Sequence, residues 1–369
     1  MGDVSRQRWD ELYSRCCEII AHPDEYTDAC RGKVLASLFF EPSTRTNFSF
    51  QSAMMRLGGN TFGFSDPMGT SVAKGETLAD TIRIVASYSD TIVMRSPLEG
   101  AATAAALYSH VPIINAGDGG RHHPTQTLAD LTTIAQKRGD IGNFTIGLCG
   151  DLKYGRTVHS LIEALSLFSG IRYYLISPSE LRMPEYHLNY MRNNGQDFIE
   201  TEQLAQCLSE LDILYMTRVQ RERFRDAKQY ERLRGVYVLD RELMKAARSD
   251  MLLMHPLPRY GEIAVDVDSD PRAVYFEQAR YGMFIRMALL YDFVHQPRIA
   301  PPPLEDMLAA RVPQAEVSKG TQVPPSIAAP CRNPICVTQT EAYLPPRNRI
   351  EDDVTRCEYC DEEIRWDIL

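Results

Sequence analysis

Three hydroxyl side chains and an arginine lie two residues after an apolar run near the start of the chain. The run 34–40 predicts a buried strand, and residues 47–57 predict a helix. Between them lie four consecutive donors, Ser43, Thr44, Arg45 and Thr46. The N-terminus of a helix favours an anion, because its first N–H groups lack partners and its dipole is positive there. The segment predicts a phosphate-sized anion site, and an ordinary helix cap with a solvated arginine is the alternative.

Four cysteines near the other end of the chain have metal-ligand spacing. Cys331 and Cys336 form a C-x4-C pair, and Cys357 and Cys360 form a C-x2-C pair. Four soft thiolates in two knuckles suit a closed tetrahedral site, so we expect one structural zinc ion per chain. A catalytic zinc is disfavoured because no coordination position stays open. Disulfides are the alternative, and a reducing compartment disfavours them.

Apolar runs alternate with longer helical stretches between residues 30 and 295. The clearest runs are 34–40, 91–94, 145–149 and 212–216. This alternation predicts α/β folding with parallel sheets. Ligands of such folds bind in the loops beyond the carboxyl ends of the strands, so functional residues should follow these runs.

The chain is predicted to contain two α/β domains and a small C-terminal β module like a zinc ribbon. The break at 139–143 ends the first domain, 1–139, which a helix near 284–296 completes. The second domain is 140–283. Eight prolines between Pro297 and Pro330 predict an extended linker over 297–327. The zinc module then spans 328–369.

Charge and hydropathy exclude several classes of function. The net charge is -9, so a general affinity for nucleic acid is not expected. Residues 331–369 carry nine acidic side chains against five arginines and no lysine, which argues against nucleic-acid binding by the module too. No apolar run approaches the ~20 residues of a membrane span, and the first residues have no apolar signal segment. A cytoplasmic enzyme is expected.

Several segments, taken together, resemble the aspartate and ornithine carbamoyltransferase family. The similarity runs from about residue 8 to 295, and its motifs occur in family order: Phe-Glu-Pro-Ser-Thr-Arg-Thr at 40–46, Ser-Val-Ala-Lys-Gly-Glu-Thr at 71–77, Met-Arg at 94–95, His-Pro-Thr-Gln at 123–126, Gly-Asp-Leu-Lys-Tyr-Gly-Arg-Thr at 150–157, Met-Thr-Arg-Val-Gln at 216–220 and His-Pro-Leu-Pro-Arg at 255–259. The resemblance implies that carbamoyl phosphate and L-aspartate yield N-carbamoyl-L-aspartate and phosphate, a step of pyrimidine biosynthesis. The first domain would bind carbamoyl phosphate and the second aspartate.

The resemblance also implies roles for individual residues. Those expected to bind carbamoyl phosphate are Ser43, Thr44, Arg45, Thr46, Ser71, Arg95, His123, Gln126, Leu257 and Pro258. Catalysis would rest on Thr46, Lys74, Arg95 and His123. Attack by an amine places negative charge on the carbonyl oxygen, which fixed donors stabilise as in an oxyanion hole. No covalent nucleophile or organic cofactor is expected.

Aspartate brings two carboxylates, which arginine forks bind well. The resemblance assigns this substrate to Lys74, Arg156, Arg218 and Gln220. In the family, the loop that carries Ser71 and Lys74 reaches into a neighbouring subunit, which implies a homotrimer with shared active sites.

Two alternatives differ in testable features. Ornithine enzymes typically carry a His-Cys-Leu-Pro motif, whereas His255-Pro256-Leu257-Pro258 stands here, so aspartate is favoured. A non-catalytic scaffold would be expected to lack Arg45, Lys74, His123 or Arg218, and all four are present.

The cysteine module resembles the zinc domain of the separate regulatory chain that accompanies many bacterial aspartate carbamoyltransferases. That resemblance implies a docking or assembly role and a higher homo-oligomer formed through the module. In those regulatory chains a nucleotide-binding domain precedes the zinc domain. The proline-rich segment here is too short for such a domain, so nucleotide regulation is not expected.

Overall fold

The strands of this protein form where the sequence is continuously apolar. The computed structural model describes residues 5–120, 123–220, 226–296, 329–351 and 354–364, so the predicted linker lies outside the described residues. The four predicted runs become β1 (Val34–Phe39), β3 (Thr91–Ser96), β5 (Phe144–Cys149) and β8 (Ile213–Met216). All four are largely buried, as parallel strands covered on both faces are. The chain divides into two compact units, which are described one at a time.

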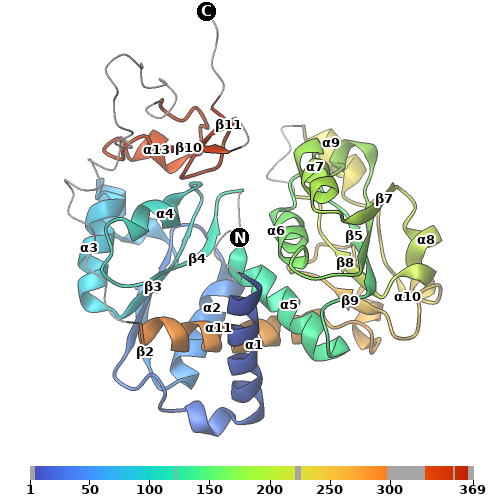
Figure 1. Ribbon diagram of the computed structural model, residues 1–369, viewed down its shortest axis with the longest axis horizontal. Coiled ribbons are helices and arrows are strands. Elements are labelled where there is room, and N and C mark those ends of the chain that lie inside the picture. The colour runs from blue at the N-terminus through green and yellow to red at the C-terminus, as the bar shows by residue number, and fades with distance from the viewer. Residues whose placement is uncertain (1–4, 121–122, 221–225, 297–328, 352–353, 365–369) are drawn as a thin grey trace, which may run out of the picture. The chain divides into compact units, whose positions relative to one another are not determined.

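Unit 2 comprises Glu18–His122 and Arg286–Leu369, and a sheet of four parallel strands forms its centre (Figure 1). The strand order is β2-β1-β3-β4, so the winding direction reverses between β1 and β3. The other elements of its first segment are η1 (Pro23–Tyr26), α2 (Thr44–Arg56), β2 (Asn60–Phe64), η2 (Pro67–Gly69), η3 (Ser71–Lys74), α3 (Leu78–Tyr88), α4 (Ala101–Ala106) and β4 (Ile113–Asp118).

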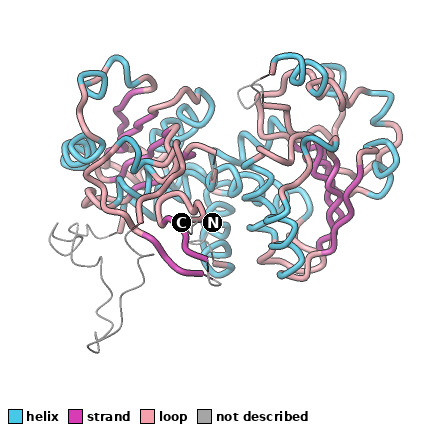
Figure 2. Tube along the Cα trace, turned by 90° about the horizontal axis from the view of Figure 1, so that it is seen from above, coloured by secondary structure: helices cyan, strands magenta, loops and turns pink. Residues whose placement is uncertain are grey.

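Unit 1 comprises Met1–Cys17 and His123–Ile285, and it contains a parallel sheet of five strands in the order β7-β6-β5-β8-β9. Figure 2 shows these strands in magenta with the usual twist between neighbours. Here the winding direction reverses between β5 and β8. The other elements are α5 (Pro124–Arg138), α6 (Arg156–Leu165), β6 (Ile171–Ile176), η4 (Ser179–Leu181), α7 (Glu185–Asn193), β7 (Asp197–Thr201), α8 (Leu204–Cys207), η5 (Leu208–Glu210), α9 (Ala227–Leu233), α10 (Arg241–Met244), β9 (Leu252–Met254) and η7 (Val265–Ser269).

Two of the three boundaries between the units lie within helices, and the third falls between His122 and His123, before α5. The two helices are α1 (Arg6–Ala21) and α11 (Tyr275–Val294). The helix expected near 284–296 begins about two and a half turns earlier in the chain, at Tyr275, and ends at Val294. The functional domain limits set at 139 and 283 remain a prediction.

The described residues 329–364 form a small module that packs on unit 2. It contains α13 (Val337–Thr340) and an antiparallel pair, β10 (Asn348–Glu351) and β11 (Val354–Cys357). Figure 1 shows it, in red, beside α3 and α4. The predicted fold, two parallel-sheet α/β domains with a C-terminal β module, is confirmed.

Unit 2 and the module share one apolar core. The side chains of Leu78, Ile82 and Tyr108 belong to the same buried cluster as Val337 and Leu344 of the module. Burial of apolar side chains is the main stabilising contribution to such packing. The module is therefore part of the folded body of unit 2.

Backbone contacts fix the position of the module further. Glu99 donates its N–H to the carbonyl of Ile335 and accepts from the N–H of Val337, both at 2.9 Å. The next residue, Gly100, has φ +80°, and a Cβ placed there would lie 2.5 Å from the carbonyl oxygen of Tyr359. A residue without a side chain is required for this close approach.

Among the described helices, none combines the length and the apolar character needed to cross a membrane.

Candidate active site and cysteine cluster

The predicted anion site lies where β1 leads into α2. Helix α2 begins at Thr44, and Ser43 is its N-cap with φ -156°. The hydroxyl of Ser43 makes no capping hydrogen bond, so the ordinary cap interpretation does not describe this residue. The first backbone N–H groups of a helix lack partners within it, and they add to the side-chain donors at this turn.

Arg95 lies near the end of β3, at the same edge of the sheet as the start of α2. Strands β1 and β3 are neighbours, with Phe39 paired with Arg95. The Nε of Arg95 donates to Oε1 of Glu41 at 2.7 Å, and the Arg95 side chain is only 13% exposed. A charge-assisted bond of this length holds the guanidinium in one orientation. Sequence reasoning did not single out Glu41, although it lies inside the 40–46 motif.

Ser71 and Lys74 lie on η3, and both residues are exposed. Thr70 precedes this turn, and its hydroxyl accepts from the N–H of Val72. Gly75 ends it with φ +92°, a conformation that suits glycine. The segment is therefore a short 3-10 turn on the surface, with Lys74 exposed.

In unit 1, Gln126 begins a buried polar network. The Nε2 of Gln126 donates to Oδ1 of Asp130 at 2.7 Å. Asp130 is fully buried and also accepts from the hydroxyl of Tyr215 at 2.9 Å and from Nε2 of Gln278 at 2.7 Å. His123 is the N-cap of α5 and is buried as well.

The network continues from Gln278 to the loop after β9. Oε1 of Gln278 accepts from the N–H of His255 at 3.0 Å. The N–H of Leu257 donates to Nδ1 of His255 at 2.8 Å, so Nε2 of the neutral ring carries the hydrogen and donates to Glu262 at 2.7 Å. Although burial raises the pKa of Glu262, the hydrogen bond from His255 holds that pKa below its usual value.

The same loop is held at a second point by an ion pair. Arg259 makes a short bidentate contact with Asp268, and its NH1 also donates to the hydroxyl of Tyr275 at 2.9 Å. The guanidinium of Arg259 holds the pKa of Asp268 below its usual value. Leu257 lies between these anchors with φ +52°, a conformation that is uncommon for a branched residue. A supported, unusual backbone is typical of a binding loop.

The residues predicted to bind the substrate aspartate lie after β5 and β8, which are neighbouring strands. Arg156 begins α6, and Arg218 comes two residues after the end of β8. The Nε2 of Gln220 donates to the carbonyl of Tyr154 at 2.9 Å, which joins the two loops.

Thr217 and Gly150 pack the same two loops together. The N–H of Asp151 donates to the hydroxyl of Thr217 at 3.0 Å. Gly150 has φ +118°, and a Cβ there would lie 2.3 Å from the carbonyl oxygen of Thr217. A small pocket opens at this edge, lined in part by Gly150, Thr217 and Val219.

A point where the winding direction of the sheet reverses lies beside Ser43–Thr46 and Arg95 in unit 2, and beside Arg156, Arg218 and Gln220 in unit 1. The other predicted residues follow β2, β4 or β9 instead: Ser71, Lys74, His123, Gln126, Leu257 and Pro258. In unit 2 the reversal point is between β1 and β3, and in unit 1 it is between β5 and β8. Open α/β sheets bind ligands at such points, because the flanking loops diverge there and leave a crevice. The topology thus supports an anion site in unit 2 and a site for a carboxylate-bearing ligand in unit 1.

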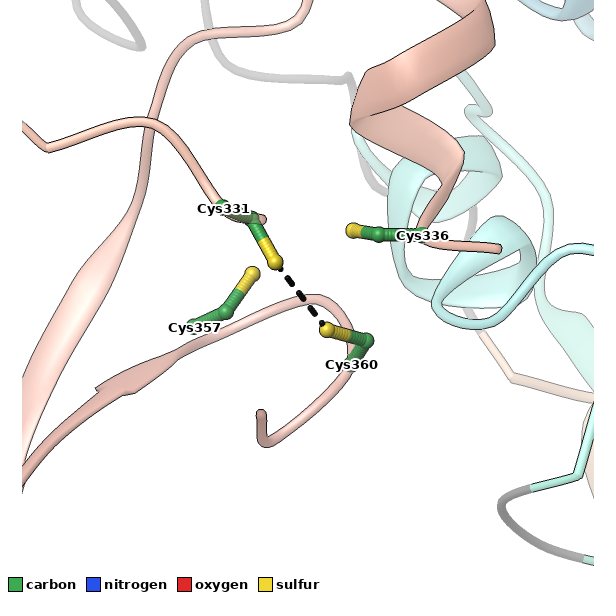
Figure 3. Close-up of side chains that lie close together, drawn as sticks. All are labelled: Cys331, Cys336, Cys357 and Cys360. Atoms are coloured by element: carbon green, nitrogen blue, oxygen red, sulfur yellow. Dashed lines mark hydrogen bonds between the residues drawn. The ribbon is translucent and has the colours of Figure 1, made fainter. Parts of the chain in front are cut away.

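The four cysteines converge in the module (Figure 3). Cys331, Cys336, Cys357 and Cys360 are buried, and their sulfur atoms all lie within 4.8 Å of one another. Sγ of Cys331 and Sγ of Cys360 are 3.5 Å apart, far from the ~2.05 Å of a disulfide. Zn–S bonds of ~2.3 Å in a tetrahedron separate the sulfurs by ~3.8 Å, so the donor set fits such an ion. The cluster is able to bind a metal.

The fold is that of a protein with two parallel-sheet α/β units, a class that binds its ligands at reversal points such as these. Residues 1–136 match the family described as aspartate/ornithine carbamoyltransferase, carbamoyl-P binding domain, and residues 142–293 match its Asp/Orn binding domain. The chain belongs to the aspartate/ornithine carbamoyltransferase family.

Individual relatives and solved structures support the same family assignment. The aspartate carbamoyltransferase catalytic subunit of Clostridium novyi is 55% identical over 288 residues, which cover 78% of this chain and 94% of the relative. The catalytic subunit of M. jannaschii aspartate transcarbamoylase has a TM-score of 0.75 at 45% identity and covers 80% of this chain and 96% of its own. Aspartate transcarbamoylase from Trypanosoma cruzi, solved with carbamoyl phosphate and aspartate, has a TM-score of 0.74 at 40% identity and covers 79% and 94%. The cysteine module lies beyond both family matches.

Proposed function

We propose that the aspartate carbamoyltransferase activity of this chain is carried out by the residues at its two reversal points, together with Lys74, the start of α5 and the loop after β9. The observation that carries this proposal is the placement of donor-rich loops at both points, together with 55% identity to an aspartate carbamoyltransferase catalytic subunit. The Trypanosoma cruzi relative, solved with carbamoyl phosphate and aspartate, supports the choice of substrates. Carbamoyl phosphate and L-aspartate are converted to N-carbamoyl-L-aspartate and phosphate.

The phosphate is bound by Ser43, Thr44, Arg45 and Thr46, and a partner's Ser71 adds a hydroxyl. The uncapped hydroxyl of Ser43 and the start of α2 support this assignment. The carbonyl oxygen of carbamoyl phosphate faces Thr46, Arg95 and His123. These donors stabilise the charge that develops as the amine attacks, and no covalent intermediate is formed. Gln126 and the backbone at Leu257 and Pro258 hold the carbamoyl amide.

The two carboxylates of aspartate are bound by Arg156 and Arg218, with Gln220 and Lys74 as further donors. The support is positional, because the first two residues flank the same reversal point. Planar guanidinium groups match carboxylates bidentately. The amine must be deprotonated before attack, and the departing phosphate is a candidate acceptor for its proton.

A product assay tests the activity directly. Purified protein should form carbamoyl aspartate from carbamoyl phosphate and aspartate, with L-ornithine as the matched control acceptor. Arg45→Ala and His123→Ala should each lower kcat/KM by ~30-fold or more, because each removes a donor to charge in the transition state. Activity with ornithine but not aspartate would reject the substrate assignment, and unchanged kinetics in both variants would reject the site.

We further propose that the cysteine cluster holds one structural zinc ion per chain. Cys331, Cys336, Cys357 and Cys360 would be its ligands, and their burial and separations support this. The ion cross-links the two knuckles and stabilises the module. Elemental analysis of protein purified without chelators should find about one zinc per chain. Less than a tenth of that amount would reject the proposal.

The enzyme is proposed to be a homotrimer in which Lys74 completes the site of a neighbouring subunit. The exposed Lys74 turn supports this, as do Phe48 and Met55, which share one face of α2 and are 63% and 58% exposed. Mixing Lys74→Ala with Arg45→Ala subunits should restore part of the activity, because some sites then combine two intact halves. If verified mixed trimers are no more active than the two parent variants, Lys74 acts in the active site of its own chain.

Each chain of the proposed trimer carries one module, and the modules join trimers into a higher homo-oligomer. None of the nine cysteines, each in the described part of the chain, forms a disulfide. This is consistent with a reducing, cytoplasmic location.

A further inference from the structure

The cysteine module supplies the N-terminal cap of α3. Glu341 accepts the N–H of Leu78 with both carboxylate oxygens, at 3.2 and 3.3 Å. The hydroxyl of Tyr343 accepts the N–H of Ala79 at 3.0 Å. Two of the four amides that a helix leaves without internal partners are thus bonded by residues more than 260 positions away in sequence.

A third amide of this helix start is capped locally. The hydroxyl of Thr77 accepts from the N–H of Asp80 at 3.1 Å, and the carbonyl of Thr77 accepts the first regular bond of the helix, from the N–H of Thr81 at 3.1 Å. The N–H groups of Leu78, Ala79 and Asp80 therefore all have partners, and two of these three are bonded by residues of the module. Leu78 and Ala79 are buried beneath it, so the cap closes over a dry helix start.

This helix start immediately follows the turn that carries Lys74. Only Gly75, Glu76 and Thr77 separate Lys74 from α3. Because the turn is attached to the helix through so few residues, the direction in which it leaves depends on how the first turn of α3 is held. Glu76 adds to this, since its carboxylate accepts from the hydroxyl of Thr81 at 2.8 Å.

Glu341, which caps α3, is also close in sequence to a ligand of the proposed metal site. Cys336 is the N-cap of α13, and Glu341 is the C-cap of the same short helix. The N–H of Glu341 donates to the carbonyl of Val337 at 2.9 Å. A single helical turn therefore joins a metal ligand to the carboxylate that holds α3.

We propose that Glu341 and Tyr343 are positioning residues for the Lys74 turn, and that the metal-bound module orients this turn for aspartate binding. The inference rests on the proposed role of Lys74. A carboxylate at a helix N-terminus is favoured by the helix dipole, so Glu341 is suited to this position. The module thus supports catalysis from outside the substrate site.

The test is a double variant, Glu341→Ala with Tyr343→Phe, compared with Glu358→Ala. Glu358 pairs with Arg347 inside the module at 2.7 Å, so this control perturbs the module away from α3. Hydrogen exchange of peptides covering 70–81 should become ~10-fold faster or more in the double variant, because buried amides lose their acceptors. Its KM for aspartate should rise ~10-fold while zinc content stays at the wild-type level. The control should change neither measurement.

Lys74→Ala, measured in parallel, separates this inference from the proposed function. If that variant is inactive while the double variant exchanges and reacts like the wild type, the positioning role is wrong and the proposed site stands. If Lys74→Ala is fully active, the assignment of Lys74 fails, and exchange over 70–81 still decides whether the module caps α3. Faster exchange with unchanged kinetics would limit the module to a structural role.

Removal of the metal provides an independent readout. Stripping zinc with a chelator should speed exchange of the 70–81 peptides as the double variant does, because Glu341 lies one short helix from Cys336. Protection unchanged after complete metal loss would overturn the link between the metal and the turn.

Discussion

At the scale of single residues, Asp130 connects two parts of the proposed carbamoyl phosphate site. It accepts from Gln126, from Gln278 and from Tyr215, and it is fully buried. A buried carboxylate with several donors holds them all in fixed positions, because each lost bond leaves a desolvated group.

Replacing Asp130 by Asn tests this role. The amide can accept at only one of the two oxygen positions, so either Tyr215 or both Gln126 and Gln278 then face an N–H group. We expect kcat/KM to fall ~10-fold to 100-fold, since a buried unsatisfied group costs about 1–3 kcal/mol. Asp10→Asn, in an exposed pair with Arg6, is the control. Equal kinetics for both variants would contradict the proposed positioning.

His159 makes the stability of unit 1 depend on pH. Burial lowers its pKa to about 4 from 6.5, and Nε2 contacts the carbonyl of Leu152 at 2.8 Å. His187 packs against its ring at 3.9 Å between centroids and adds a second imidazole. Because the folded-state pKa is depressed, the unfolded chain takes up a proton first as the pH falls below 6.5.

We therefore expect stability to be lost between pH 6.5 and 4, by at most about 3 kcal/mol from His159. His159→Gln should show a smaller fall in Tm from pH 7.5 to pH 5 than the wild type. His22→Gln, at an exposed position, should retain the wild-type fall. An identical pH dependence in all three proteins would show that this histidine does not contribute.

At the scale of elements, the loops after β5 and β8 depend on one glycine. Gly150→Ala would place a methyl group 2.3 Å from the carbonyl oxygen of Thr217 at φ +118°. We expect a loss of about 2 kcal/mol or more in stability and a higher KM for aspartate, because both arginine loops must shift. Gly195→Ala, at φ +65° with nothing within 4 Å, is the matched control for backbone strain alone. If KM for aspartate also rises in the control, the contact with Thr217 is not the cause of the effect.

At the scale of the whole molecule, the C-terminal module and unit 2 share a core, so the metal should stabilise more than the module. Loss of zinc would expose apolar side chains of α3 and α4 that the module covers. We expect chelation to lower the Tm of the chain by ~5 °C or more, since even 1 kcal/mol shifts Tm by several degrees. Gly100→Ala, which blocks the close approach to Tyr359, should lower Tm similarly with zinc still bound. Gly32→Ala, at φ +76° in open space, is its control.

The sequence by itself determined the fold class, the family and the metal-binding cluster. Continuous apolar runs predict buried parallel strands, and cysteine spacing predicts a cluster, because both patterns are local and depend on few residues. The 40–46 motif likewise marks the start of α2, since strand, turn and helix are consecutive there. The roles of the site residues remain predictions.

Tertiary structure alone decided which distant segments meet. Glu41 orients Arg95, Asp130 joins Gln126 to Gln278, and Glu341 caps α3. No local sequence pattern predicts these contacts. An acidic residue that bonds a distant amide looks the same in sequence as one on an exposed loop. The module also packs onto unit 2 despite the proline-rich segment before it, since linker composition predicts stiffness but not where a domain docks. The packing of apolar surfaces decides that position, because the sequence shows which residues are apolar but not which of them come into contact.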